Sequence, residues 1–404
     1  MDSQNLKTMN ISAPQIKTLD QILPEEPLLM MGAGPVPIPE AVAQANGIVI
    51  NHLGDTMAQI IGQVKTMAGY IFQTASPWIV GVAGPGSAAM EMAVANLVWK
   101  DTKVLSICNG FFSGRLSEMA ERAGGQVEKL MVSEGDSANV EIIRAELERL
   151  KPEVITIVQG ETSNTTHNHE LPAIGELAKE FGCYLIVDAV CTLSTLPLHM
   201  DEWHIDAVIT GGQKGLSSIP GVSLVAFSEK AWRRIDTRPY QLPQWTLDAK
   251  LATNFWHKAS YHYTAPVSGL LALHEAMRLV CRETLDERFR RHQVCSEALQ
   301  EAIETLGLDL YVPKVNRLNS VVGIKLPEGL EAKTVCGHIS KHYRVEIAGS
   351  FGPPIVRIGQ MGEQCRAHNL FRTLHALGST FNDLGVDVDV PSSMAALENA
   401  LQRK

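Results

Sequence analysis

One lysine stands where a buried amine would be chemically useful. Lys214 lies in a glycine- and serine-rich segment, 210–221, between the apolar runs 205–209 and 222–227. This order indicates a strand, a tight turn and a second strand. A lysine that points inward from such a turn can lose its proton and form an imine with a carbonyl compound. The alternative is an ordinary loop lysine, because lysine is rarely buried.

Two further charged residues interrupt apolar runs. Asp188 ends the run 184–187, and Arg357 lies in the short run 355–358. A carboxylate is costly to bury unless a cation or a strong donor meets it. Asp188 is therefore either the partner of a protonated cofactor nitrogen or a helix cap or structural ion pair. Arg357 is either a two-point clamp for a carboxylate or a core ion-pair partner.

A glycine-rich turn follows the apolar run 78–83 and precedes a helical pattern that starts at Ala88. Strand, glycine-rich turn and helix together point free backbone N–H groups at an anion. The amides of Gly86, Ser87 and Ala88 are candidates to bind a phosphate, and a plain turn is the alternative. The spacing is not that of a dinucleotide-binding fingerprint.

The elements around these residues alternate between strand and helix patterns. This rhythm predicts an α/β fold with a mainly parallel, seven-stranded-type sheet sandwiched by helices. Ligands bind outside the carboxyl ends of such strands, where Ser87, Phe112, Thr162 and Asp188 fall. A long helical stretch from about 267 to 306 then leads to a small C-terminal α+β domain. We expect three parts: an N-terminal arm (1–28), a large cofactor-binding domain (29–280) and a small domain (281–404).

The composition excludes several classes of protein. The net charge is −9 and no basic block offsets it, which argues against a nucleic-acid or anionic-membrane partner. No apolar stretch is long enough to cross a bilayer, and residues 1–23 lack the pattern of a signal or transit peptide. The seven cysteines are scattered without a CxxC pair, which predicts reduced thiols in a cytoplasmic protein and no metal site.

Several short motifs occur in an order that resembles one enzyme family. They are Gly32-Ala33-Gly34-Pro35, Gly84-Pro85-Gly86-Ser87, Asn109-Gly110-Phe111-Phe112, Gly160-Glu161-Thr162-Ser163, Val187-Asp188-Ala189-Val190, Gly212-Gln213-Lys214, Tyr261 to Val267 and Arg357-Ile358-Gly359. Over about residues 28 to 385 the chain resembles the class V (fold type I) pyridoxal-phosphate aminotransferases. Within that family it is similar to the alanine–glyoxylate and serine–pyruvate group.

The resemblance implies pyridoxal 5′-phosphate (PLP) as cofactor. Lys214 would form the internal aldimine and move the proton between the substrate and the cofactor, and Asp188 would keep the pyridinium nitrogen protonated. Phe112 and Val190 would cover the two ring faces, and Thr162 would bond near the ring hydroxyl. The implied phosphate ligands are Gly86, Ser87, Ala88 and Gln213, with Tyr261 and Thr264 from the neighbouring subunit of a homodimer. Arg357 would hold the substrate carboxylate, with Gly34 and Thr162 beside it.

Some residues depart from the family pattern. Pro85 removes one N–H donor from the phosphate turn, Phe112 replaces the usual tryptophan, and Thr162 replaces the usual serine. Asn164-Thr165-Thr166 lacks the glycine that usually follows the GESS-like turn. Since that turn lies near the substrate in the family, the identity of the amino donor is the least defined property.

The resemblance implies ping-pong transamination between a small amino acid, alanine or serine, and a 2-oxo acid, glyoxylate or pyruvate. One alternative is another class V reaction, such as cysteine desulfuration or β-elimination. A desulfurase needs a mobile nucleophilic cysteine, whereas Cys336 and Cys365 fall in helical patterns. A second alternative is a cofactor-bound protein without activity on the same fold.

Overall fold

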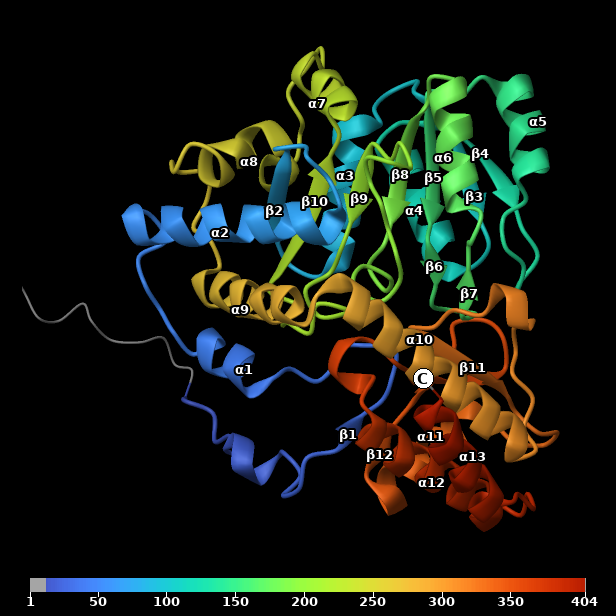
Figure 1. The fold of residues 1–404 in the computed structure, drawn as a ribbon. Helices are drawn as coiled ribbons and strands as arrows, with labels where there is room; N and C mark the ends of the chain where they lie inside the picture. The colour runs from blue at the N-terminus through green and yellow to red at the C-terminus, as the bar shows by residue number, and fades with distance from the viewer. Residues whose placement is uncertain (1–11, 404) are drawn as a thin grey trace, which may run out of the picture.

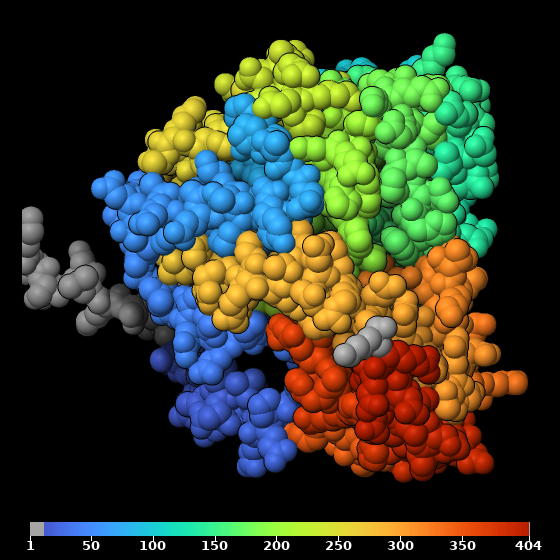
Figure 2. All heavy atoms as spheres, in the orientation of Figure 1, coloured from blue at the N-terminus to red at the C-terminus, as the bar shows by residue number. Residues whose placement is uncertain are grey.

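The computed structural model describes residues 12–403. Residues 1–11 and 404 lie outside this range. Part of the predicted N-terminal arm (1–28) and part of the segment without a targeting pattern (1–23) therefore lie outside the described residues. Residues 12–27 are exposed and contain only the short 3-10 helix Leu19–Gln21. In Figure 2 this segment lies along the edge of the molecule, beside the small C-terminal part.

A seven-stranded sheet forms the centre of the larger part (Figure 1). Strand β10 runs antiparallel to both of its neighbours, and the other neighbouring pairs are parallel. The predicted mainly parallel sheet is therefore confirmed. In spatial order the strands are β2 (Ile79–Ala83), β10 (Val222–Phe227), β9 (Ala207–Ile209), β8 (Tyr184–Asp188), β5 (Val154–Val158), β3 (Lys103–Cys108) and β4 (Gln126–Met131).

Helices cover both faces of this sheet, which explains why its central strands are almost wholly apolar. Helices α3 (Gly86–Leu97) and α4 (Phe111–Arg122) pack together on one face, and α5 (Val140–Leu150) and α6 (Leu171–Glu180) on the other (Figure 1). Five more helices belong to this part: α1 (Glu40–Asn46), α2 (Asp55–Phe72), α7 (Glu229–Asp236), α8 (Ala249–Trp256) and α9 (Val267–Glu283).

The C-terminal part has its own hydrophobic core and the predicted α+β architecture. A three-stranded antiparallel sheet has the order β11 (Val321–Lys325), β14 (Ile355–Gly359) and β13 (Ala348–Gly349), and β1 (Leu29–Met30) pairs with β12 (Val345–Glu346). Its helices are α10 (Leu285–Thr305), α11 (Ala332–Tyr343), α12 (Ala367–Asp383) and α13 (Val390–Gln402). Met31 packs in this second core, and the exact domain boundaries stay a prediction.

The single long helix predicted over about 267–306 is wrong. The chain turns at Thr284, whose φ of 70° ends α9 (Val267–Glu283) before α10 begins. Glu283 forms ion pairs with Arg288 at 2.7 Å and with Arg291 at 2.5 Å, which fixes the corner between the two helices. Apolar spacing continues on both sides of Thr284, so periodicity alone does not reveal the break.

None of the helices in the described part of the chain has the length and hydrophobicity of a membrane span.

Candidate active site

The carboxyl ends of the sheet strands enclose a pocket of about 180 Å³. Eight residues that the sequence singled out line this one pocket: Gly86, Ser87, Phe112, Thr162, Asp188, Val190, Gln213 and Lys214. They come from the starts of α3 and α4 and from the chain beyond β5, β8 and β9. Met90, Arg115, Gly160 and Cys191 also line it.

Lys214 lies on the connection between the antiparallel strands β9 and β10, as the strand–turn–strand pattern predicts. Its Nζ donates a hydrogen bond to the carbonyl of Ala33, and burial lowers the pKa of its amine. Gly34, with φ of 97°, packs directly against it: a Cβ at this position would lie 2.5 Å from Nζ. The N-terminal glycine turn therefore forms a wall against the lysine.

Asp188 is the last residue of β8 and is 6% exposed. Its carboxylate accepts one hydrogen bond, from the N–H of Val190 at 2.7 Å, and forms no ion pair within residues 12–403. Burial raises the pKa of this carboxyl to about 7. A buried carboxylate with so few donors is under-satisfied, and a cation beside it would lower its pKa again.

Helix α3 begins beside the same pocket. Within the described residues, no acceptor meets the N–H of Gly86 or Ser87, whereas the N–H of Ala88 donates to the Pro85 carbonyl at 2.9 Å. Ala88 does not line the pocket. The side-chain oxygen of Gln213 is buried there without a hydrogen-bond partner. The free N–H groups of Gly86 and Ser87 can bind an anion, whereas the Gln213 oxygen is an acceptor that lacks a donor.

Phe112 is held at the pocket wall by a carboxylate that the sequence analysis did not single out. Glu161 is fully buried and accepts hydrogen bonds from the N–H groups of Phe112 (3.2 Å) and Ser113 (2.9 Å) at the start of α4. A carboxylate at a helix N-terminus stabilises the unpaired N–H groups there. On another wall, a Cβ on Gly86 would lie 2.9 Å from Val190, which places these two residues in close contact.

Arg357 lies on β14 beside the pocket and is 4% exposed. Its Nε donates to the Gly349 carbonyl at 2.8 Å, and its Nη1 donates to the Thr162 carbonyl at 2.6 Å. Burial lowers the pKa of the guanidinium to about 10. The remaining N–H groups have no partner in residues 12–403, so they stay available for a carboxylate.

Tyr261 and Thr264 do not reach this pocket. Both are exposed, and Thr264 lines a separate groove of about 640 Å³ together with Val49 and His52. The Tyr261 ring lies 5.9 Å from that of His52. Within one chain, these two residues therefore contribute nothing to the pocket of Lys214.

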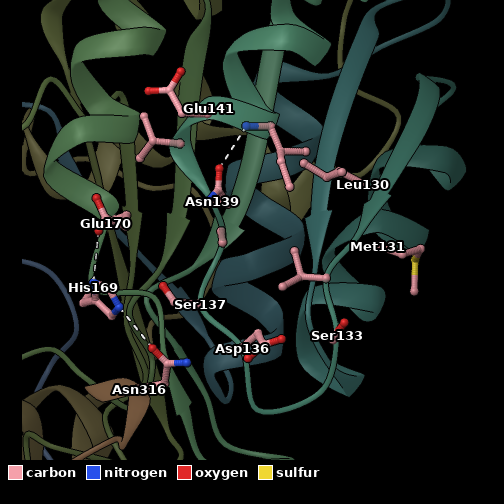
Figure 3. A pocket seen from close by; sticks show the side chains of 14 residues that line it. Leu130, Met131, Ser133, Asp136, Ser137, Asn139, Glu141, His169, Glu170 and Asn316 are labelled. Carbon is pink, nitrogen blue, oxygen red and sulfur yellow. Dashed lines mark hydrogen bonds and ion pairs between the residues drawn. The ribbon is translucent and has the colours of Figure 1, made fainter. Parts of the chain in front are cut away.

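Another groove, of about 540 Å³, lies between β4, α5 and the start of α6 (Figure 3). His169 bridges it by a 3.1 Å hydrogen bond to Asn316 of the C-terminal part. The groove contains none of the predicted site residues. Its lining residues are Leu130, Met131, Val132, Ser133, Asp136, Ser137, Ala138, Asn139, Val140, Glu141, Ile142, His169, Glu170 and Asn316.

Arg115 is the pocket residue with the clearest signal that the sequence analysis missed. It follows Phe112 by three positions on a helical pattern, and residues so spaced share one helix face. Once Phe112 is assigned to a ligand pocket, the same spacing points Arg115 toward it.

Residues 40–367 match the family described as Aminotransferase class-V. An alanine–glyoxylate aminotransferase from Drosophila melanogaster is 33% identical over 393 residues, which cover 95% of this chain and 99% of that protein. The crystal structure of a ureidoglycine–glyoxylate aminotransferase from Bacillus subtilis superposes with a TM-score of 0.91 at 29% identity, covering 94% of this chain and 100% of the other. The structure of an alanine–glyoxylate aminotransferase from Nostoc sp. gives a TM-score of 0.86 at 32% identity, covering 91% and 100%.

Proposed function

Because the chain belongs to the class V aminotransferase family, we propose that it transfers the amino group of a small amino acid, alanine or serine, to glyoxylate or pyruvate. The observation that carries the proposal is the convergence of Lys214 and Asp188 on one pocket that also contains free anion-binding groups. Relatives named for transfer to glyoxylate support this acceptor first.

The pocket residues fit pyridoxal 5′-phosphate, the cofactor we propose. Asp188 lacks a cationic partner, which a protonated ring nitrogen would supply. The N–H groups at the start of α3 are free for the phosphate, to which the side-chain NH2 group of Gln213 would also donate. Phe112 and Val190 would cover the two ring faces, and Thr162 would bond near the ring hydroxyl. When bound, PLP supplies the electron sink for the carbanion formed at the substrate Cα.

The side chains divide the remaining work. Lys214 would move the proton between the substrate Cα and the cofactor. This transfer requires an amine that is neutral for part of the cycle. Burial of Lys214 favours that neutral form. Arg357 orients the substrate by its carboxylate, beside Gly34 and Thr162, while its tether to the Thr162 carbonyl keeps the guanidinium in place.

We also propose that the active form is a homodimer, in which Tyr261 and Thr264 complete the partner's phosphate site. Their exposure on the single chain supports this arrangement. Large apolar side chains are exposed on the arm and in nearby segments, as expected of a surface that a second copy covers. They include Ile16, Leu19, Ile48, Val49, Trp245 and Tyr261.

We propose a cytoplasmic location, which rests on the cysteines. All seven are unpaired and are buried or half-buried.

Neither Cys336 nor Cys365 suits the alternative reaction, cysteine desulfuration. Cys336 lies within α11, and burial raises the pKa of its thiol to about 11. Cys365 is fully buried, and its pKa is also raised by burial. A reactive thiolate requires the opposite conditions, exposure and a lowered pKa.

The proposal is tested by mixing the purified, PLP-loaded protein with single amino acids. We expect alanine or serine to abolish the visible absorption band of the lysine-bound cofactor, and glyoxylate or pyruvate to restore it. 2-Oxoglutarate serves as the comparison acceptor. No spectral change with any amino acid would exclude transamination.

A further inference from the structure

Arg115 is a cation in the pocket without an ionic partner. It lies on α4 and lines the pocket that contains Lys214. Its Nη1 donates a hydrogen bond to the Ser87 hydroxyl at 3.2 Å. No carboxylate within residues 12–403 forms an ion pair with it, whereas Arg122 on the same helix pairs with Glu118. Its charge also helps to lower the pKa of Asp188 in the same pocket, although the two side chains form no ion pair. An arginine in a concave site without an ion-pair partner points to an anion from outside the chain.

Two aromatic rings fix the position of this guanidinium. Its carbon ζ lies 5.0 Å from the ring centres of both Phe111 and Phe112. Arginine stacks on aromatic faces, so the rings hold the side chain against the pocket wall and restrict its rotation. Since the Glu161 carboxylate holds the Phe112 backbone, the guanidinium rests on a rigid support.

The anion-binding end of the pocket otherwise lacks positive charge. Gly86, Ser87, Ala88 and Gln213 are neutral, and so are Tyr261 and Thr264 of a neighbouring subunit. Pro85 has no N–H, and the N–H of Ala88 already donates to the Pro85 carbonyl. Two free amides, one hydroxyl and one amide side chain remain for a group that carries nearly two negative charges. Burying such a charge among neutral donors alone is unfavourable.

We propose that Arg115 is the cation that balances the cofactor phosphate, directly or through the Ser87 hydroxyl that it contacts. The inference rests on the proposed function, because it assumes that PLP occupies this pocket. Arg115 then determines the preference for the phosphorylated cofactor, while Arg357 serves the substrate carboxylate on the other side of Thr162.

The test compares two ligands that differ only in the phosphate. Apoprotein is titrated with PLP and with pyridoxal, and the quenching of tryptophan fluorescence gives both dissociation constants. For Arg115→Gln we expect PLP affinity to fall by about 10- to 100-fold, the usual size of a lost charge-assisted hydrogen bond, and pyridoxal affinity to stay within about twofold. Inorganic phosphate should raise the melting temperature of wild-type apoprotein and should not raise that of the variant.

Arg122→Gln is the matched control, because it removes an exposed arginine from the same helix and should change neither constant. Arg115→Met retains an unbranched chain against both phenylalanine rings. If Arg115→Gln does not fold, the ratio of the two constants in Arg115→Met decides the question.

Equal weakening of PLP and pyridoxal would overturn the proposal and make Arg115 a support for Phe112 alone. An unchanged PLP affinity with a raised KM for the amino acid would overturn it in favour of a substrate contact. If the variant gives either of these two results and still transfers amino groups, only the role of Arg115 is refuted and the proposed function stands. The proposed function would be refuted instead if wild-type protein bound PLP and no amino acid changed its visible absorption spectrum.

Discussion

Two regions supply the proposed cofactor ligands, and one chain completes only the first. Asp188 ends strand β8 and Lys214 lies on the connection between β9 and β10, and both line one pocket. Tyr261 and Thr264 lie on the exposed connection between α8 and α9. Under the proposed function, the sheet of a single chain positions the groups for proton transfer, whereas a second chain would complete the anchoring of the cofactor.

The second region is nevertheless well fixed to its own chain. His262 is buried and hydrogen-bonds through Nε2 with the Trp245 carbonyl at 2.9 Å, and the Tyr263 hydroxyl accepts from the N–H of Ala83 at 3.2 Å. His262 and Tyr263 thus face inward, and the residues that flank them, Tyr261 and Thr264, face outward. A rigid segment that presents polar side chains outward suits a role in a second subunit's site.

The largest effect is expected in the pocket that contains Asp188 and Lys214. Lys214→Ala should reduce amino transfer from alanine by at least about 10³-fold, because it removes the group that moves the proton. Single-turnover spectra measure this rate, and Lys250→Ala, a half-buried lysine outside the pocket, is the control. A variant that retains half-reaction turnover would show that the proton is moved by another group.

The second largest effect is expected in the connection that contains Tyr261 and Thr264. Tyr261→Phe combined with Thr264→Ala should lower activity at limiting PLP by about 100-fold, the cost of two hydrogen bonds to a charged group. Mixing this variant with Lys214→Ala and allowing subunits to exchange should restore activity to about a quarter of wild type, since half of randomly paired dimers contain one intact site. Mixtures no more active than their components would place both residues in their own chain's site.

The third prediction concerns Asp188 without cofactor. Its folded pKa, about 7, lies above the unfolded value of 3.8, so this group favours the native state below pH 3.8 and loses that contribution as the pH rises to 7. At pH 8 we expect the free energy of unfolding of apo Asp188→Asn to be about 2 kcal/mol higher than that of wild type. This is about half of the free energy that corresponds to the whole change in the Asp188 pKa. The difference should disappear near pH 4.

Urea unfolding at several pH values measures this difference at equal protein concentration. Loading with PLP should reverse the order, because the ring nitrogen then stabilises the carboxylate of the wild type. If apo wild type is the more stable protein at pH 8, Asp188 already has a cationic partner in the chain.

Some of the features behind these predictions can be predicted from the sequence, and others cannot. The turn at Lys214, the Asp188 strand end and the start of α3 were predictable, because glycine positions and apolar runs are local patterns. The break at Thr284 was not, because apolar spacing continues through it. The contacts of Arg115 with Ser87 and of Arg357 with the Thr162 carbonyl depend on how α4 packs on α3 and how the C-terminal part meets the large sheet. Such contacts join residues far apart in the chain, and no local pattern encodes them.

The smallest effect tests how the second region is fixed. Tyr263→Phe removes only the hydroxyl that accepts from Ala83, so it should lower the free energy of unfolding by about 1 kcal/mol. Its ring still packs beside His262, with centroids 4.6 Å apart, so the segment should keep its course and PLP affinity should change less than twofold. Tyr261→Phe is the paired variant: loss of its exposed hydroxyl should weaken PLP binding and leave the free energy of unfolding of the single chain unchanged. Urea unfolding and PLP titration of both variants separate the two roles. If Tyr263→Phe weakened PLP as strongly as Tyr261→Phe, inward and outward residues would act as one unit, and the division between anchoring the segment and anchoring the cofactor would fail.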